Sequence, residues 1–258
     1  MDDGKTGNAW GEGVWIALSF LLLFGLWEIA GLIPINLAFP RFSSVAAALW
    51  EMMLNGEFAK AYAQTLPPLL IGIGAVFVGG VLAGIVMGLS RSFEWMFMPL
   101  MVILQTAPMA ALIPLVTFLY GIGLASKVMA VVILAAPLVV LNSYQGIRDT
   151  SASLLDMCRS FQGTRHQQIV KIMLPYASGM IFAGLRLGLS AGFIGIILAE
   201  LLITPTGIGD LITYNRSIAR YDKMFAAIVS IIVLSAVTLA VLQRVESRAF
   251  GRGRFQAP

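Results

Sequence analysis

The chain has 258 residues, of which 59% are hydrophobic and 12% are charged, and its formal net charge is +4. Its mean hydropathy of +0.88 is far above that of a soluble domain of this length, so the composition predicts an integral membrane protein. The single cysteine, Cys158, excludes an intramolecular disulfide, and the single histidine, His166, excludes a metal site built from several histidines.

Six apolar windows are long enough, at about 20 residues, to cross a hydrocarbon core of about 30 Å. The alternating pattern of a transmembrane barrel is absent, and helices satisfy their own backbone hydrogen bonds in lipid. The sequence therefore predicts an all-α membrane protein with about six transmembrane helices in a single domain over 1–258. The expected spans are 14–33, 68–90, 95–120, 125–146, 177–203 and 223–243.

The first span follows an acidic start and lacks a small-residue cleavage site, which favours a retained helix over a signal peptide. Glu28 lies near its far end, where an interfacial or inter-helix contact is expected. The next segment, 42–64, is expected to contain a short amphipathic helix. Its apolar side consists of Val45, Leu49, Met52 and Met53.

Glycine recurs every four residues in the second and fifth spans, which lets neighbouring helices approach closely. Ordinary packing explains this spacing; alternatively, the fifth span lines a translocation path. In the third span, prolines near Gln105 each remove a backbone donor and predict either tolerated kinks or an irregular pore wall. These glycines and prolines are Gly80, Gly84, Gly88, Gly184, Gly188, Gly192, Pro108 and Pro114.

Two ionisable residues, Arg186 and Glu200, lie inside the fifth span, where charge is costly unless it faces protein or water. They are separated by about 21 Å along a helix and by about 40° around it, so they share a face but cannot pair directly. Each therefore either bonds to a neighbouring helix or acts electrostatically along a path.

Residues 150–175 form a polar, amphipathic interruption between two apolar spans. Ser153 with Asp156, and Thr164 with Gln167, have the spacing of capping boxes, which predicts two short helices. Between them Gln162 and Gly163 are expected to form a turn, and Leu174 with Pro175 to close the second helix. The first helix is expected to carry one apolar stripe, made of Leu154, Met157, Cys158 and Phe161. The simplest alternative is a loop that rests on lipid headgroups.

Lysine and arginine are more frequent on the side that holds both termini and 147–175, so this side is expected to be cytoplasmic. The basic C-terminal tail is expected to face anionic lipid rather than nucleic acid. Arg216, Arg220 and Lys223 lie on the opposite side, where they would favour an anionic solute.

The polar segment resembles the EAA loop of binding-protein-dependent ABC transporter permeases, which reads Glu-Ala-Ala, three residues, Gly, and later a hydrophobic residue, Leu and Pro. Here the pattern falls on Asp156-Met157-Cys158, Gln162 and Met173-Leu174-Pro175. Three further stretches resemble the nitrate, sulfonate, taurine and bicarbonate branch of this family. They are PRFSSVAAALWEMM, QTAPMAALIPLVTFLYGIG and the segment from Gly184 to Ile212.

This resemblance implies a type I ABC importer permease fold in a bacterial inner membrane, with cytoplasmic N and C termini. It implies a second permease copy or, alternatively, a closely related permease as its partner in the membrane. It also implies two ATP-binding subunits that hold ATP and Mg²⁺, and a periplasmic or lipid-anchored solute-binding protein docked on 42–64 and 204–222. The residues implied in ATPase coupling are Ser153, Asp156, Met157, Cys158, Phe161, Gln162, Gly163, Leu174 and Pro175. The pathway candidates are Gln105, Pro108, Pro114, Arg186, Gly188, Gly192 and Glu200.

The chain has no G-x-x-x-x-G-K-[ST] phosphate loop, so no ATPase site, catalytic site or cofactor is expected in it. A competing hypothesis is a stand-alone secondary transporter or channel, in which 147–175 is an interfacial loop and Arg186 and Glu200 belong to an ion path. A third is a membrane anchor that scaffolds a complex. The sequence does not name the solute.

Overall fold

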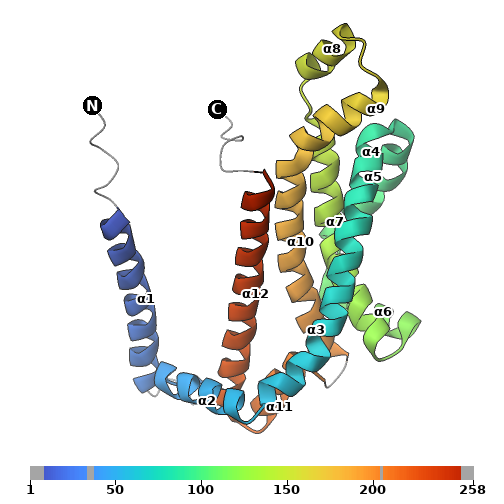
Figure 1. Ribbon diagram of the computed structural model, residues 1–258. Helices are drawn as coiled ribbons and strands as arrows, with labels where there is room; N and C mark the ends of the chain where they lie inside the picture. The colour runs from blue at the N-terminus through green and yellow to red at the C-terminus, as the bar shows by residue number, and fades with distance from the viewer. Residues whose placement is uncertain (1–8, 34–37, 204–205, 251–258) are drawn as a thin grey trace. The chain divides into compact units, whose positions relative to one another are not determined.

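The computed structural model describes residues 9–33, 38–203 and 206–250, and every regular element in these ranges is a helix (Figure 1). The all-α prediction is confirmed. The α-helices are α1 (Ala9–Leu32), α2 (Phe42–Leu54), α3 (Glu57–Ala75), α4 (Val81–Leu89), α5 (Arg91–Thr106), α6 (Met109–Tyr120), α7 (Leu124–Arg148), α8 (Ala152–Ser160), α9 (Arg165–Gln168), α10 (Leu174–Leu202), α11 (Ile208–Ser217) and α12 (Tyr221–Phe250). Two π-helices, η1 (Val76–Gly80) and η2 (Ile169–Met173), continue α3 into α4 and α9 into α10.

The number of candidate spans is four, or five if one bent pair of helices counts as a single span. The apolar part of α1, Ala17–Leu32, is shorter than the other spans, which accounts for one of the six expected. The four long spans are Glu57–Leu89, Leu124–Arg148, Arg165–Leu202 and Tyr221–Arg248.

The third expected span, 95–120, is not one helix but two, α5 and α6, which meet at an angle of 115°. The break falls at Ala107 and Pro108, whose backbones are extended. Proline disfavours helical geometry in the residue before it, so the chain leaves the helix at Ala107. By contrast, Pro114 lies inside α6 without ending it.

The chain divides into two compact units, and the first comprises residues up to Ala59 together with Leu211–Ser230. Aromatic rings fill part of it: Phe24 stacks on Phe42 at 4.5 Å, and Trp27 meets Phe225 at 6.0 Å between ring centroids. The Glu28 carboxylate accepts hydrogen bonds from the backbone N and the Oγ of Ser43, at 2.9 and 2.8 Å. It thereby satisfies a free backbone donor at the start of α2, which confirms the expected inter-helix contact.

Helix α2 is amphipathic, but its buried face differs slightly from the predicted one. Val45, Ala48 and Met52 are buried, whereas Met53 is 54% exposed. Met53 lies eight residues after Val45, about 80° further around the helix, so it falls outside the stripe.

The second unit comprises Lys60–Asp210 and Ile231 onward, and its centre is α7, with α4 and α10 packed against it (Figure 1). A Cβ atom on Gly84 of α4 would lie 2.5 Å from the carbonyl oxygen of Val140, and one on Gly188 of α10 would lie 2.4 Å from Val139 Cγ2. A Cβ on Gly195 would lie 2.9 Å from the carbonyl oxygen of Ala130. The glycine spacing therefore serves close helix packing, as one of the two interpretations predicts.

Candidate functional site

The polar segment 150–175 forms an elbow of two short helices that extends beyond the ends of α7 and α10 (Figure 1). The first is α8, and the second consists of α9 and η2 and runs without interruption into α10. The prediction that Leu174 and Pro175 close the second helix is therefore wrong. Pro175 is tolerated because it lies in the first turn of α10, directly after a π-helical turn, where helices commonly adjust their hydrogen bonding.

One of the two predicted capping boxes is present. The backbone N of Thr164 donates to Gln167 Oε1 at 2.9 Å, and the backbone N of Gln167 donates to Thr164 Oγ1 at 3.3 Å. The box predicted at Ser153 is wrong, because α8 begins earlier, with Ser151 at its N-cap. Ser153 thus lies within the first turn, and Asp156 instead pairs with Arg159 at 2.9 Å.

The turn after α8 explains why the EAA pattern has glycine at the position that Gln162 occupies here. Gln162 has a φ of 56°, in the left-handed region, its N donates to the carbonyl of Arg159, and the N of Gly163 donates to that of Cys158, both at 2.9 Å. These two bonds form a Schellman motif, in which glycine is the preferred left-handed residue. Gly163 has a different constraint, because a Cβ there would lie 2.3 Å from Cys158 Sγ.

The apolar stripe of α8 is divided between the inside and the outside of the elbow. Leu154 and Cys158 are half-buried, whereas Met157 is 51% and Phe161 82% exposed. The end of α8 therefore presents two large apolar side chains among mostly polar exposed residues, and Val170 of η2 adds a third to the elbow at 45% exposure.

The base of the elbow is tied to α5 through Glu94, a residue that the sequence did not single out. Its carboxylate accepts a 2.6 Å hydrogen bond from the Tyr144 hydroxyl and pairs with Arg148, at the end of α7. The Arg148 guanidinium also lies 5.8 Å from the centre of the Tyr144 ring. These contacts join the first turn of α5 to the last two turns of α7, directly before the elbow.

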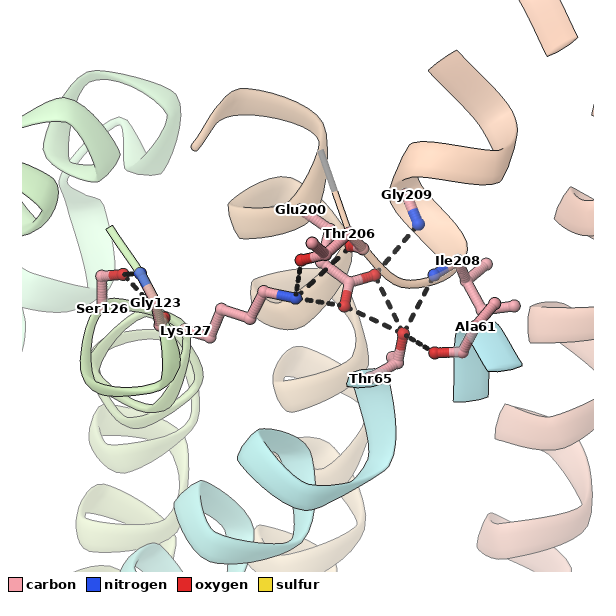
Figure 2. A network of polar contacts seen from close by, with 9 residues as sticks. All are labelled: Ala61, Thr65, Gly123, Ser126, Lys127, Glu200, Thr206, Ile208 and Gly209. Atoms are coloured by element: carbon pink, nitrogen blue, oxygen red, sulfur yellow. Dashed lines mark hydrogen bonds and ion pairs between the residues drawn. The ribbon is translucent and has the colours of Figure 1, made fainter. Parts of the chain in front are cut away.

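A second polar site lies near the other end of α7 and α10 (Figure 2). Lys127 Nζ lies 2.8 Å from Glu200 Oε1, and the two side chains are 5% and 0% exposed. Thr65 Oγ1, from α3, lies 2.9 and 3.0 Å from the two carboxylate oxygens. Lys127 also donates to Thr206 Oγ1 at 3.0 Å, and the backbone N of Gly209 donates to Glu200 Oε2 at 2.9 Å.

Only Glu200 of this network was singled out from the sequence. Lys127 lies in the first turn of α7 and is buried there. Thr65 carried no signal, because a lone threonine in an apolar helix is common. Glu200 therefore has a counterion, Lys127, and a hydroxyl partner, Thr65, that spacing along the chain cannot reveal.

The remaining pathway candidates do not gather at one place. Arg186 pairs with Glu246 of α12, so Arg186 and Glu200 each bond to a neighbouring helix and not to one another. Gly188 and Gly192 are buried against α7 and α3. The exposed candidates are Gln105, Pro108 and Pro114, which lie before, at and after the break between α5 and α6.

Lys223 does not belong to an exposed basic rim. It is 5% exposed, and its Nζ lies 2.9 Å from Glu57 and 3.1 Å from Glu51. Of the three basic residues predicted to favour an anionic solute, Arg216 and Arg220 are the exposed ones.

Comparison with known proteins agrees with this architecture. The chain resembles the permease of the MetNI methionine ABC transporter in an inward-facing conformation, with a TM-score of 0.64 and 18% identity, over 76% of this chain and 96% of that one. This likeness establishes the fold.

Curated relatives match most of the chain. A putative aliphatic sulfonates transport permease protein of Bacillus subtilis, SsuC, is 27% identical over 95% of this chain and 88% of its own length. The glycine betaine/carnitine transport permease protein GbuB of Listeria monocytogenes is 30% identical over 77% of this chain and 70% of its own. The taurine transport system permease protein TauC of Escherichia coli is 25% identical, with the same coverage.

Residues 77–251 match the family described as binding-protein-dependent transport system inner membrane component. This match covers the elbow and all of the Glu200 network except Thr65, and it is to the membrane component of such a system, not to its ATP-hydrolysing subunit. The chain therefore belongs to this family, as a permease subunit of an ABC importer.

Proposed function

We propose that this permease works as a homodimer with two ATP-binding subunits and a solute-binding protein, in a bacterial inner membrane, and that the elbow binds the ATPase. The observation that carries the proposal is the exposure of Met157 on α8 and of Phe161 at its C-cap. Large apolar side chains exposed on a short polar helix indicate a surface that a partner covers. The capping box and the Schellman motif hold this surface rigid, which favours binding without an ordering cost.

The elbow is also suited to pass a movement into the membrane. Its first end follows α7, which Glu94 ties to α5, and its second end is continuous with α10. A displacement of the elbow by an ATPase subunit would therefore reach three helices directly. This is the kind of two-state element that nucleotide binding can bias.

The distribution of lysine and arginine supports an orientation with both termini and the elbow in the cytoplasm. The Glu200 network then lies toward the periplasm, since α10 is 29 residues long and spans about 43 Å. In this orientation the segments 42–64 and 204–222 offer the surface for a solute-binding protein.

The path for solute is proposed to run along the break between α5 and α6, where Gln105, Pro108 and Pro114 are exposed. Arg186, Gly188, Gly192 and Glu200 make contacts inside the chain, which supports a role in holding the wall of the path. The relatives include permeases for sulfonates, taurine and glycine betaine or carnitine. A small polar or anionic organic solute is the proposed class, and the exposed Arg216 and Arg220 favour it.

The test of the elbow is co-purification of the ATPase subunit with the tagged permease. Phe161→Ala should weaken binding about 30-fold and so reduce the amount recovered, because a buried aromatic anchor contributes about 2 kcal/mol to an interface. Ser160→Ala, which changes the adjacent exposed position on α8, is the matched control and should recover the wild-type amount. Equal recovery with Phe161→Ala and wild type contradicts the proposed binding site.

A second test measures coupling in proteoliposomes. Asp156→Lys replaces an attraction to Arg159 by a repulsion, and Gly163→Leu drives a side chain into Cys158. Both variants should hydrolyse ATP without solute uptake while the permease dimer stays intact. Unchanged transport by both variants would contradict the proposal that the elbow docks on the ATPase. Uptake by the permease without any ATPase subunit would favour a secondary transporter.

A further inference from the structure

The network around Glu200 does more than neutralise a buried lysine (Figure 2). Ile208 and Gly209 are the first two residues of α11, whose backbone N–H groups have no acceptor within the helix. Ile208 N donates to Thr65 Oγ1 at 3.0 Å, and Gly209 N donates to Glu200 Oε2 at 2.9 Å. Side chains of α3 and α10 therefore cap α11 from outside.

The turn before α11 is shaped for this contact. Gly207 has a φ of 87°, and a Cβ on it would lie 2.1 Å from Glu200 Oε1. A Cβ on Gly209 would lie 2.4 Å from Glu200 Cβ. The Gly-Ile-Gly sequence thus lets the backbone approach the carboxylate closely, which no other residue type permits at these two positions.

Burial makes these contacts costly to break. Thr65 and the Glu200 side chain are both fully buried, and Lys127 Nζ adds a bond to Thr206 on the turn. If the turn moved away, the buried carboxylate and the threonine hydroxyl would each lose a donor in a site that excludes water. The turn should therefore stay attached to α3, α7 and α10 as the helices move.

We propose that Thr65, Lys127 and Glu200 are positioning residues for transport, which fix the start of α11 to α3, α7 and α10. A solute-binding protein seated on 204–222 would then act on all three helices at once. This inference rests on the function proposed above and adds a route by which a bound solute-binding protein would stimulate ATP hydrolysis.

The first experiment uses the purified permease alone, in nanodiscs, and measures hydrogen–deuterium exchange of the segment that contains Ile208 and Gly209. Thr65→Val keeps the shape of the side chain but removes the hydroxyl, so exchange should become about tenfold faster, the value for one lost hydrogen bond. Thr65→Ser keeps the hydroxyl and should exchange like the wild type. Glu246→Gln, at the ion pair with Arg186 elsewhere on α10, is a control that should leave this segment unchanged.

The second experiment uses the complex with its ATPase subunits and measures ATP hydrolysis with and without the purified solute-binding protein. The ratio of stimulated to basal hydrolysis should fall severalfold in Thr65→Val and recover in Thr65→Ser. The folded fraction of each variant complex is isolated by size-exclusion chromatography before the measurement. If Thr65 served only stability, this ratio would be unchanged in that fraction. Glu200→Gln keeps an acceptor for Gly209 N but leaves Lys127 without a counterion, and its ratio should also fall.

The outcomes separate the two proposals. Unchanged exchange in Thr65→Val shows that the network does not hold the turn, and faster exchange with a wild-type ratio shows that it does not carry the stimulation. Either result overturns the inference while leaving the importer function intact. If the wild-type complex itself shows no ATP hydrolysis that responds to the solute-binding protein, the proposed function fails before any variant is compared, and the inference fails with it.

Discussion

Lys127 and Glu200 lie 73 residues apart in the chain, yet the ammonium of one and the carboxylate of the other are 2.8 Å apart and almost inaccessible to solvent. Each charge is stable there only because the other is present, since an unpaired charge in such a site loses its hydration without compensation. The effects of substituting the two residues should therefore depend strongly on one another.

Removal of one charge should destabilise the permease more than removal of both. Lys127→Met leaves a buried carboxylate without its counterion, at a cost of about 3–5 kcal/mol. The double variant Lys127→Met with Glu200→Gln has no buried charge and keeps an acceptor for Gly209 N, so it should be more stable than either single variant. Unfolding of the detergent-solubilised protein measures this double-mutant cycle, and additive losses would contradict the prediction.

Exchange of the two charges should not restore stability. In Lys127→Glu with Glu200→Lys the ion pair can form again, but lysine has no acceptor for the backbone N of Gly209. The swapped variant should therefore unfold at a lower temperature than the uncharged double variant. Equal unfolding temperatures would show that the cap of α11 contributes nothing.

Gly84 should be intolerant of even one methyl group. A Cβ there would lie 2.5 Å from the carbonyl oxygen of Val140 and 2.6 Å from Ser143 Cβ, so Gly84→Ala should cost about 1–3 kcal/mol. Gly74, in α3, is the matched control: a Cβ on it meets nothing within 4 Å, and Gly74→Ala should stabilise the helix by about 0.5–1 kcal/mol. Thermal unfolding of both variants checks the opposite signs.

Gln162→Gly should stabilise the elbow. Gln162 occupies the left-handed region at a φ of 56°, where a residue with a side chain costs about 1 kcal/mol relative to glycine. Hydrogen–deuterium exchange of 152–163 should become slower in Gln162→Gly and faster in Gln162→Val, because a β-branched residue fits this conformation least. The same order should hold for resistance to limited proteolysis, and faster exchange in the glycine variant would refute the assigned geometry.

Loss of the Tyr144 hydroxyl should loosen the base of the elbow. Tyr144→Phe removes the 2.6 Å hydrogen bond to Glu94 and should cost about 1–3 kcal/mol, as for a hydrogen bond to a charged group. Tyr214→Phe is the control, because that ring is 57% exposed. A thermal shift of similar size in both variants would exclude a specific role for the bond.

The local features of the elbow were readable from the sequence because they depend on neighbours along the chain. The Thr164–Gln167 box requires a spacing of three residues, and such a spacing survives in any fold that places a helix there. The same rule gave a wrong prediction at Ser153, because the spacing does not determine whether Ser151 or Ser153 caps the helix. Helix α8 begins two residues earlier than that box requires, and hydropathy carries no information on this.

Contacts between helices were only half predictable. The cost of burying charge indicated that Glu200 must have a partner, but it did not identify Lys127 or Thr65, which come from other helices. Hydropathy likewise shows one apolar stretch across 95–120, although the chain turns by 115° within it. The direction of a helix and the partners of its side chains depend on packing between segments that lie far apart in sequence. Such packing leaves no periodic pattern in a single sequence.

The glycines that face α7 have a mechanical consequence. At these glycines the backbones of α4 and α10 lie directly against backbone atoms of α7 or against its short, stiff side chains, such as that of Val139. Such a contact is stiff: it cannot be compressed when α7 is pushed, so a displacement at the elbow loses little amplitude on its way into the bundle. A change that introduces slack, such as Val139→Ala beside Gly188, should weaken the link between ATP hydrolysis and transport even where the protein still folds.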